Sequence, residues 1–133
     1  MAVGTKTGQA QNDTYLKATI DDEDFYADAP GNLSNQNLIA IFASSKDKNQ
    51  KIEIYIDSKR GLGTYTLGKD KGSMIYTNSK GHWIASKFRG EGTITLTEVG
   101  DYLIGKFSFT AVVNKIKKQI TDGEFRVKKK VNK

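Results

Sequence analysis

An all-β fold is what the amino-acid sequence predicts: a single-domain antiparallel β-sandwich or a flattened meander barrel, with roughly 8–10 strands. Three observations support it. Apolar residues alternate with polar ones along several segments, glycines interrupt the chain at short intervals, and no long segment has helical periodicity. With 133 residues, 37% hydrophobic and 27% charged, the chain has room for one domain with its own core.

Alternation is clearest in the segments 51–57, 93–97 and 107–113. Successive side chains of a strand point to opposite faces, so each segment should present one dry face and one wet face. These segments therefore predict half-buried antiparallel strands. The complete set of expected strands covers residues 14–20, 24–29, 37–44, 50–57, 63–67, 73–78, 82–88, 91–98, 102–113 and 117–127.

Glycine and aspartate mark the expected turns, because both tolerate the positive φ that tight reversals require. The segments 98–101 (Glu-Val-Gly-Asp) and 121–124 (Thr-Asp-Gly-Glu) are predicted chain reversals. The segment 30–36, where Pro30 precedes polar residues, is the one candidate for a helical turn, and we expect a loop there.

The formal net charge of +6 comes from the C-terminal end. Residues 115–133 hold 8 of the 21 Lys and Arg residues but 2 of the 15 Asp and Glu residues, which leaves residues 1–114 balanced at 13 against 13. We therefore expect a flexible polar lead at 1–13, the β domain at 14–127 and a basic tail at 128–133.

Composition argues against several kinds of chemistry. The absence of cysteine excludes disulfides, a thiolate nucleophile and sulfur-based zinc sites. His82 is the single histidine and has no nucleophile motif beside it, and the carboxylates clustered at 21–24 lie between two strand signals, where Asp favours turns. We expect no enzyme, no cofactor and no metal site. We also expect no transmembrane segment, because no apolar run approaches the roughly 20 residues that span a bilayer.

Several motifs follow one another in a recognisable order: GTYTLG at 63–68, GTITLTE at 92–98 and GKFSFTA at 105–111. With the first expected hairpin at 16–27 and ITDGEF at 120–125, they resemble the small all-β domains of unknown function found in Bacteroidetes envelope proteins, many of them lipoproteins. The resemblance spans residues 14–127 and implies a compact sandwich or barrel without assigned activity or site residues. It also suggests the cell envelope, although this sequence shows no signal peptide or lipidated cysteine before the domain and has an added Lys128-Lys129-Lys130 run.

Rings and cations interleave between residues 76 and 89, a mixture suited to stacking on planar ligands and to binding anions. The candidate ligand or partner contacts are Tyr76, His82, Trp83, Lys87 and Arg89. If the sheet closes into a barrel, this segment would line a cavity near Trp83 and make the chain a small-ligand carrier. The competing interpretation places Trp83 in the core and the cations in solvent.

A second candidate contact set is basic and C-terminal: Lys115, Lys117, Lys118, Arg126, Lys128, Lys129 and Lys130. Lysine at this density binds the phosphates of nucleic acid or anionic lipid, or does no more than keep a chain end solvated. We expect any charge-driven anionic partner to dock at that one end of the molecule.

The absence of a credible catalytic set favours a non-catalytic interaction or structural module. Such a module would bind a protein partner, or form a homo-oligomer or part of a larger assembly. The small-ligand carrier and the polyanion binder are the alternative hypotheses.

Overall fold

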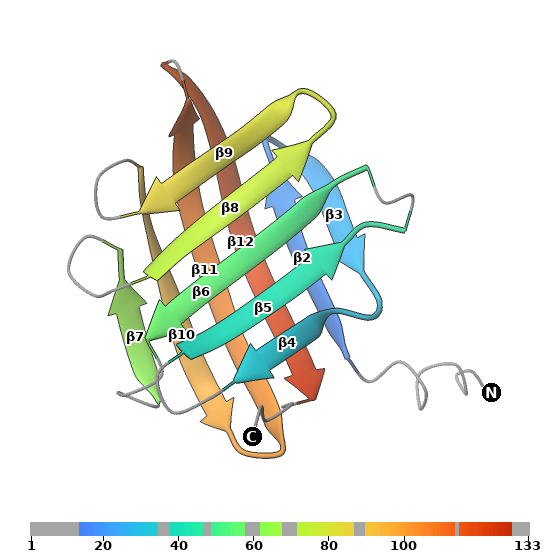
Figure 1. Ribbon diagram of the computed structural model, residues 1–133, viewed down its shortest axis with the longest axis vertical. Helices are drawn as coiled ribbons and strands as arrows, with labels where there is room; N and C mark the ends of the chain where they lie inside the picture. The colour runs from blue at the N-terminus through green and yellow to red at the C-terminus, as the bar shows by residue number, and fades with distance from the viewer. Residues whose placement is uncertain are drawn as a thin grey trace.

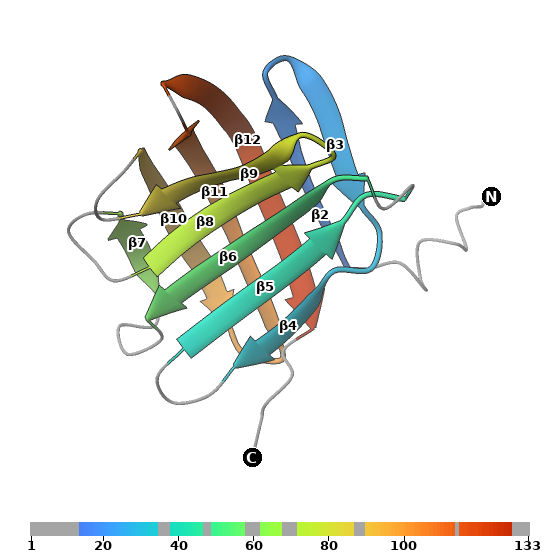
Figure 2. The same ribbon diagram turned by 45° about the horizontal axis from the view of Figure 1, so that its top comes forward.

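The computed structural model describes residues 14–34, 38–46, 49–57, 62–67, 72–86, 90–113 and 115–128. This part of the chain contains strands and no helix, arranged as two antiparallel sheets (Figure 1). The sheets face each other, and the strands of one cross those of the other (Figure 2). They are not closed into a barrel. The predicted all-β class is confirmed, and of its two forms the structure is the sandwich.

The larger sheet has six strands and contains the first and the last strand of the described residues. β12 lies at its centre between β2 and β11, so the last strand is paired on both sides. In spatial order the strands are β3 (Glu23–Ala27), β2 (Tyr15–Ile20), β12 (Ile116–Lys128), β11 (Tyr102–Val113), β10 (Glu91–Val99) and β7 (Gly63–Thr66).

The smaller sheet has five strands, all from the middle of the sequence. In spatial order they are β4 (Gly31–Ser34), β5 (Leu38–Ser44), β6 (Lys51–Asp57), β8 (Gly72–Asn78) and β9 (Gly81–Ser86). The chain passes between the sheets after β3, β6, β7 and β9, so each sheet contains segments that are distant in sequence.

Each of the ten expected segments contains a strand, but the segment 30–36 differs from the prediction. Residues Gly31–Ser34 form β4 and pair with β5, with Gly31 opposite Phe42 and Ser34 opposite Ile39. Pairing at the sheet edge satisfies backbone groups that a loop would leave to solvent. The polar sequence after Pro30 therefore marks an edge strand, not a loop or a helical turn.

The predicted reversal at 98–101 is confirmed as the β10–β11 connection, whereas the one at 121–124 is wrong. β12 runs without a break from Ile116 to Lys128, and its pairing register shifts by one residue against both β2 and β11 near Asp122. Asp122 has a φ of 52°. One extra residue in one strand with local positive φ is a β-bulge, which bends a strand without ending it.

Alternate side chains of both sheets point into the space between them and form one core. The predicted dry faces at 51–57, 93–97 and 107–113 all point inward, which confirms their strand periodicity. The fully buried large side chains are Tyr65, Phe125, Leu16, Ile41, Ile52, Ile54, Ile56, Met74, Ile94, Leu96, Leu103 and Ile120.

Candidate functional site

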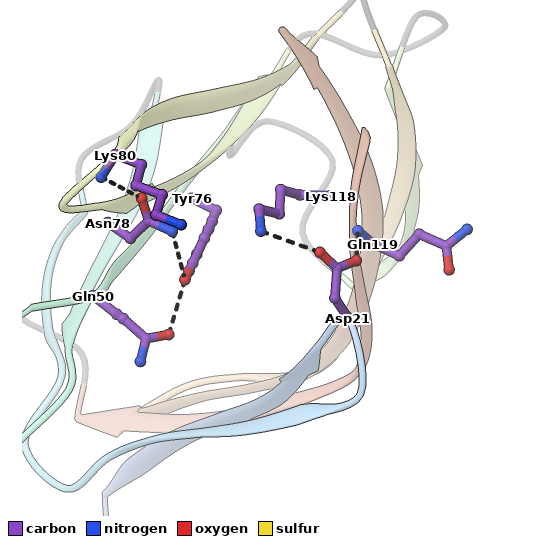
Figure 3. Close-up of polar contacts among 7 residues, drawn as sticks. All are labelled: Asp21, Gln50, Tyr76, Asn78, Lys80, Lys118 and Gln119. Carbon is purple, nitrogen blue, oxygen red and sulfur yellow. Dashed lines mark hydrogen bonds and ion pairs between the residues drawn. The ribbon is translucent and has the colours of Figure 1, made fainter. Parts of the chain in front are cut away.

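A polar cleft of about 360 Å³ lies between the two sheets where several connections meet (Figure 3). The larger sheet contributes the β2–β3 turn and the first residues of β12, and the smaller sheet contributes the approach to β6 and the β8–β9 turn. The lining residues are Ile20, Asp21, Glu23, Asn49, Gln50, Tyr76, Asn78, Ser79, Lys80 and Lys118. A volume of this size lies at the small end of the range for small-ligand sites.

The carboxylate of Asp21 is held in place by β12. Asp21 N–H donates to the carbonyl oxygen of Gln119 at 2.9 Å, and Gln119 N–H donates to Asp21 Oδ1 at 2.9 Å. Asp21 and Asp22 form the two-residue turn between β2 and β3, with φ values of 46° and 74°. The sequence predicts a turn at these clustered carboxylates, and Asp21 and Asp22 confirm it.

Lys118 lies opposite Ala111 on the inner face of the larger sheet and points into the cleft. Its Nζ is 3.3 Å from Asp21 Oδ2 and 5.1 Å from the centroid of the Trp83 ring. The side chain is 25% exposed. The ammonium therefore combines an ion pair with a cation–π contact in a partly desolvated place, where both are stronger than on open surface.

The facing wall carries a chain of polar contacts from the smaller sheet (Figure 3). Tyr76 O–H donates to Gln50 Oε1 at 2.9 Å, and Asn78 Nδ2 makes a long contact of 3.5 Å to the Tyr76 hydroxyl. Asn78 Oδ1 accepts from Lys80 N–H at 2.8 Å. These contacts fix the amide and hydroxyl groups that face Asp21 and Lys118.

Trp83 lies behind this wall, paired with Tyr76 across β8 and β9. It is 8% exposed, and its ring centroid is 5.9 Å from that of Tyr76. Its Nε1–H is buried and finds no hydrogen-bond partner among the described residues. A buried polar group without a partner costs roughly 1–3 kcal/mol, and such groups are few in native proteins.

The outer face of the smaller sheet is a second distinctive surface, and the sequence analysis missed it. Phe42, Tyr55 and Leu33 point away from the core there, and the Phe42 and Tyr55 rings meet edge to face with centroids 6.0 Å apart. Ile75 and Ile84 continue the face across β8 and β9. The sequence signal for this surface is the run Leu38–Ala43, in which the residues on both faces of the strand are apolar.

A family model described as a domain of unknown function, DUF6252, matches residues 12–127. The chain belongs to the DUF6252 family. Searches of curated proteins and of solved structures gave no match. The DUF6252 match confirms the predicted resemblance at the level of a domain of unknown function, and it assigns no activity to the cleft or to the outer face.

In this DUF6252 chain the expected ring and cation cluster is divided by strand alternation. Tyr76 and Trp83 point inward, whereas the neighbouring His82 is exposed on the outer face, with Nδ1 2.9 Å from Thr77 Oγ1. The cation that contacts Trp83 is Lys118, from the other candidate set. Four of the candidate residues lie outside the described residues: Lys87, Arg89, Lys129 and Lys130.

The described basic residues of the DUF6252 chain do not gather at one end. Lys115 and Lys117 are exposed at the β11–β12 hairpin, and Lys128 is exposed at the far end of β12. At 3.3 Å per residue this strand of 13 residues is roughly 40 Å long. Lys118 points inward, and the guanidinium of Arg126 stacks 4.2 Å from the centroid of the Tyr102 ring. The expectation of a single basic end is wrong for these residues.

In the described part of the DUF6252 chain, no group of three or more His, Cys, Asp or Glu side chains is placed to hold a metal ion. Within the same residues, no helix is long and apolar enough to cross a membrane.

Proposed function

We propose that this chain is a non-catalytic binding module that holds a protein partner against the outer face of its five-stranded sheet. The observation that supports this most is the apolar surface formed there by Leu33, Leu38, Phe42, Tyr55 and Ile75. An antiparallel sheet with one face on a core normally turns polar side chains to water on the other. Contiguous exposed apolar surface is typical of interaction sites.

The face also has the residue types that dominate binding energy. Phe42 is 39% exposed and is held by Tyr55, and aromatic side chains at the centre of an interface are frequent hot spots. Tyr55 O–H donates to Glu53 Oε1 at 2.6 Å, so its ring is fixed before a partner arrives. A surface that is already ordered loses less conformational entropy on binding.

The net charge favours a different protein over a second copy. Two chains that each carry a formal charge of +6 repel one another, so we propose a partner of neutral or negative net charge. The resemblance to Bacteroidetes envelope domains supports a partner in the cell envelope. A polyanion is less well supported, because the described basic residues lie at both ends of β12 instead of forming one patch.

The test uses Phe42→Lys. The new lysine would lie opposite Glu53, a cross-strand pair that should preserve the sheet. Thr110→Lys is the matched control, because it places a lysine opposite Glu91 on the outer face of the other sheet. A partner crosslinked in source cells is purified, and its affinity for the three proteins is measured by titration calorimetry.

Phe42→Lys should weaken binding by about tenfold or more, and Thr110→Lys should leave it unchanged. Equal affinity of all three proteins would refute the proposed face. Light scattering gives one further outcome. If the isolated chain forms a stable dimer and Phe42→Lys dissociates it, the partner on this face is a second copy of the chain.

A further inference from the structure

Glu53 lies at the centre of the apolar outer face. It belongs to β6, the third of the five strands of the smaller sheet, and it points outward because its neighbours Ile52 and Ile54 are in the core. Its partners across the sheet are Phe42 on β5 and Ile75 on β8. Residues directly opposite one another have Cβ atoms about 4.5–5.5 Å apart. A carboxylate therefore lies between apolar side chains on both sides.

The carboxylate of Glu53 is half-buried and has one hydrogen-bond partner among the described residues. Its Oε1 accepts from Tyr55 O–H at 2.6 Å. In that part of the chain no lysine or arginine forms an ion pair with it, Lys51 on the same face of β6 included. An ionised carboxylate has acceptor sites on both oxygens. Glu53 Oε2 is therefore available to a donor from outside the chain.

A partner that covers the outer face takes Glu53 out of water. This step rests on the function proposed above: a surface that buries Phe42 and Ile75 also covers the residue between them. Burial of an ionised carboxylate without a counter-charge is costly. A partner that places an apolar or acidic side chain here is disfavoured, and one that places a cation here is selected.

The neighbouring aromatic rings favour a guanidinium over an ammonium group. The Phe42 and Tyr55 rings meet at 75° with centroids 6.0 Å apart, and Phe42 is directly opposite Glu53. A cationic side chain that reaches Glu53 therefore passes beside the Phe42 ring. A guanidinium is planar, stacks on aromatic rings, donates two parallel hydrogen bonds to a carboxylate and is less strongly hydrated than an ammonium.

We propose that the partner inserts an arginine into the outer face, with its guanidinium paired to Glu53 and packed against the Phe42 ring. Tyr55 O–H holds the carboxylate in position for this contact. A single arginine at the centre of the contact is compatible with a partner of neutral or negative net charge. Arginine is also one of the residue types that are enriched at protein interfaces.

The first experiment uses peptides of known sequence as the probe. A library of short random peptides displayed on phage is selected on the native chain and, separately, on Glu53→Gln, which removes the charge but keeps an oxygen for Tyr55 O–H. Peptides that depend on the outer face are recognised because they lose affinity for Phe42→Lys. Arginine should be enriched among those selected on the native chain and not among those selected on Glu53→Gln. Enrichment of lysine instead, or of neither, would overturn the proposal.

The second experiment measures the pairing itself. One selected peptide is synthesised with arginine and with citrulline, its neutral isostere, and both are titrated by calorimetry. The arginine form should bind the native chain about tenfold more tightly, and this preference should largely disappear with Glu53→Gln. Glu91→Gln is the control, because it removes an exposed carboxylate from the other sheet and should keep the preference. Equal binding of both forms to the native chain would refute the arginine.

The two proposals fail in different ways. If the selected peptides bind Phe42→Lys as tightly as the native chain, the proposed face itself is wrong, and the arginine with it. If they lose affinity for Phe42→Lys but bind Glu53→Gln as tightly as the native chain, the face stands and the arginine is refuted.

Discussion

Gly123 lies directly beneath the ring of Phe107: a Cβ atom at Gly123 would sit 2.6 Å from three carbons of that ring. The glycine follows the β-bulge at Asp122 and faces the core. Its missing side chain makes room for Phe107 between Phe109 and Phe125, whose ring centroids are 6.3 and 6.2 Å away. The bulge in the central strand and the packing of the aromatic core therefore depend on each other.

Replacement of this glycine should be costly. Gly123→Ala would force a methyl group into the Phe107 ring, and overpacking of this kind destabilises by about 1–3 kcal/mol. Gly100→Ala is the control, because a Cβ at Gly100 would meet nothing within 4 Å. The free energy of unfolding, measured in urea, should fall for the first variant and change little for the second. Equal stability of both variants would show that the ring moves aside freely.

The two residues of the β2–β3 turn test two different contributions to stability: backbone strain at Asp22 and side-chain contacts at Asp21. Asp22 has a φ of 74°, which costs a non-glycine residue about 1 kcal/mol, so Asp22→Gly should stabilise the fold by about 0.5 kcal/mol after its own entropy cost. Asp21→Ala removes an acceptor for Gln119 N–H and the partner of Lys118, and should destabilise by about 1–2 kcal/mol. Thermal and urea unfolding measure both. A stabilised Asp21→Ala would show that these contacts do not stabilise the fold.

Most of the fold could be predicted because its signal is local. Ile52, Ile54 and Ile56 alternate with polar neighbours, and burial of one face follows from strand geometry alone. The Asp122-Gly123 pair shows the limit of such signals. An aspartate with positive φ fits both a hairpin turn and a bulge. Here it forms a bulge because β12 stays paired with β2 and β11 before and after Asp122.

The candidate site was less predictable, since it depends on register between distant strands. The alternation of His82 and Trp83 was sufficient to place them on opposite faces, but it does not say which face is inner. The contacts of Lys118 with Trp83 and Asp21 form only after distant strands have paired, since Asp21 and Lys118 are 97 residues apart in the sequence. No local sequence pattern predicts these contacts. The apolar outer face required knowing which face of β5 the core would cover.

Two adjacent residues of β5 test the assignment of inner and outer faces. Ile41 is 0% exposed in the core and Phe42 is 39% exposed on the outer face. Ile41→Ala should lower the free energy of unfolding by about 2–5 kcal/mol through loss of buried surface and the cavity left behind. Phe42→Ala, which removes a larger side chain, should cost about 1 kcal/mol or less. If Phe42→Ala were the more damaging in urea titrations, the strand would be turned over relative to this structure.

The hydroxyl of Tyr55 on the outer face gives a test by titration. Its hydrogen bond to Glu53, together with burial and the nearby negative charge, raises the pKa of Tyr55 to about 12 from an ordinary 10.0. A raised pKa means that the folded chain keeps this proton longer than the unfolded chain does. The stability that this bond contributes is therefore complete below pH 10 and is lost as the pH rises from about 10 to about 12.

The chain has six tyrosines, so the contribution of Tyr55 must be isolated by difference. Phenolate absorbance is followed against pH for the native chain and for Tyr55→Phe, and the difference curve should titrate well above pH 10. Glu53→Gln removes the charge but keeps an amide oxygen as acceptor, so the difference curve should move toward the ordinary pKa without reaching it, since burial also raises it. A difference curve centred near pH 10 in the native chain would mean that Tyr55 and Glu53 are apart in solution. The aromatic anchor proposed for the partner would then not be fixed in advance, because that contact is what orients the Tyr55 ring against Phe42.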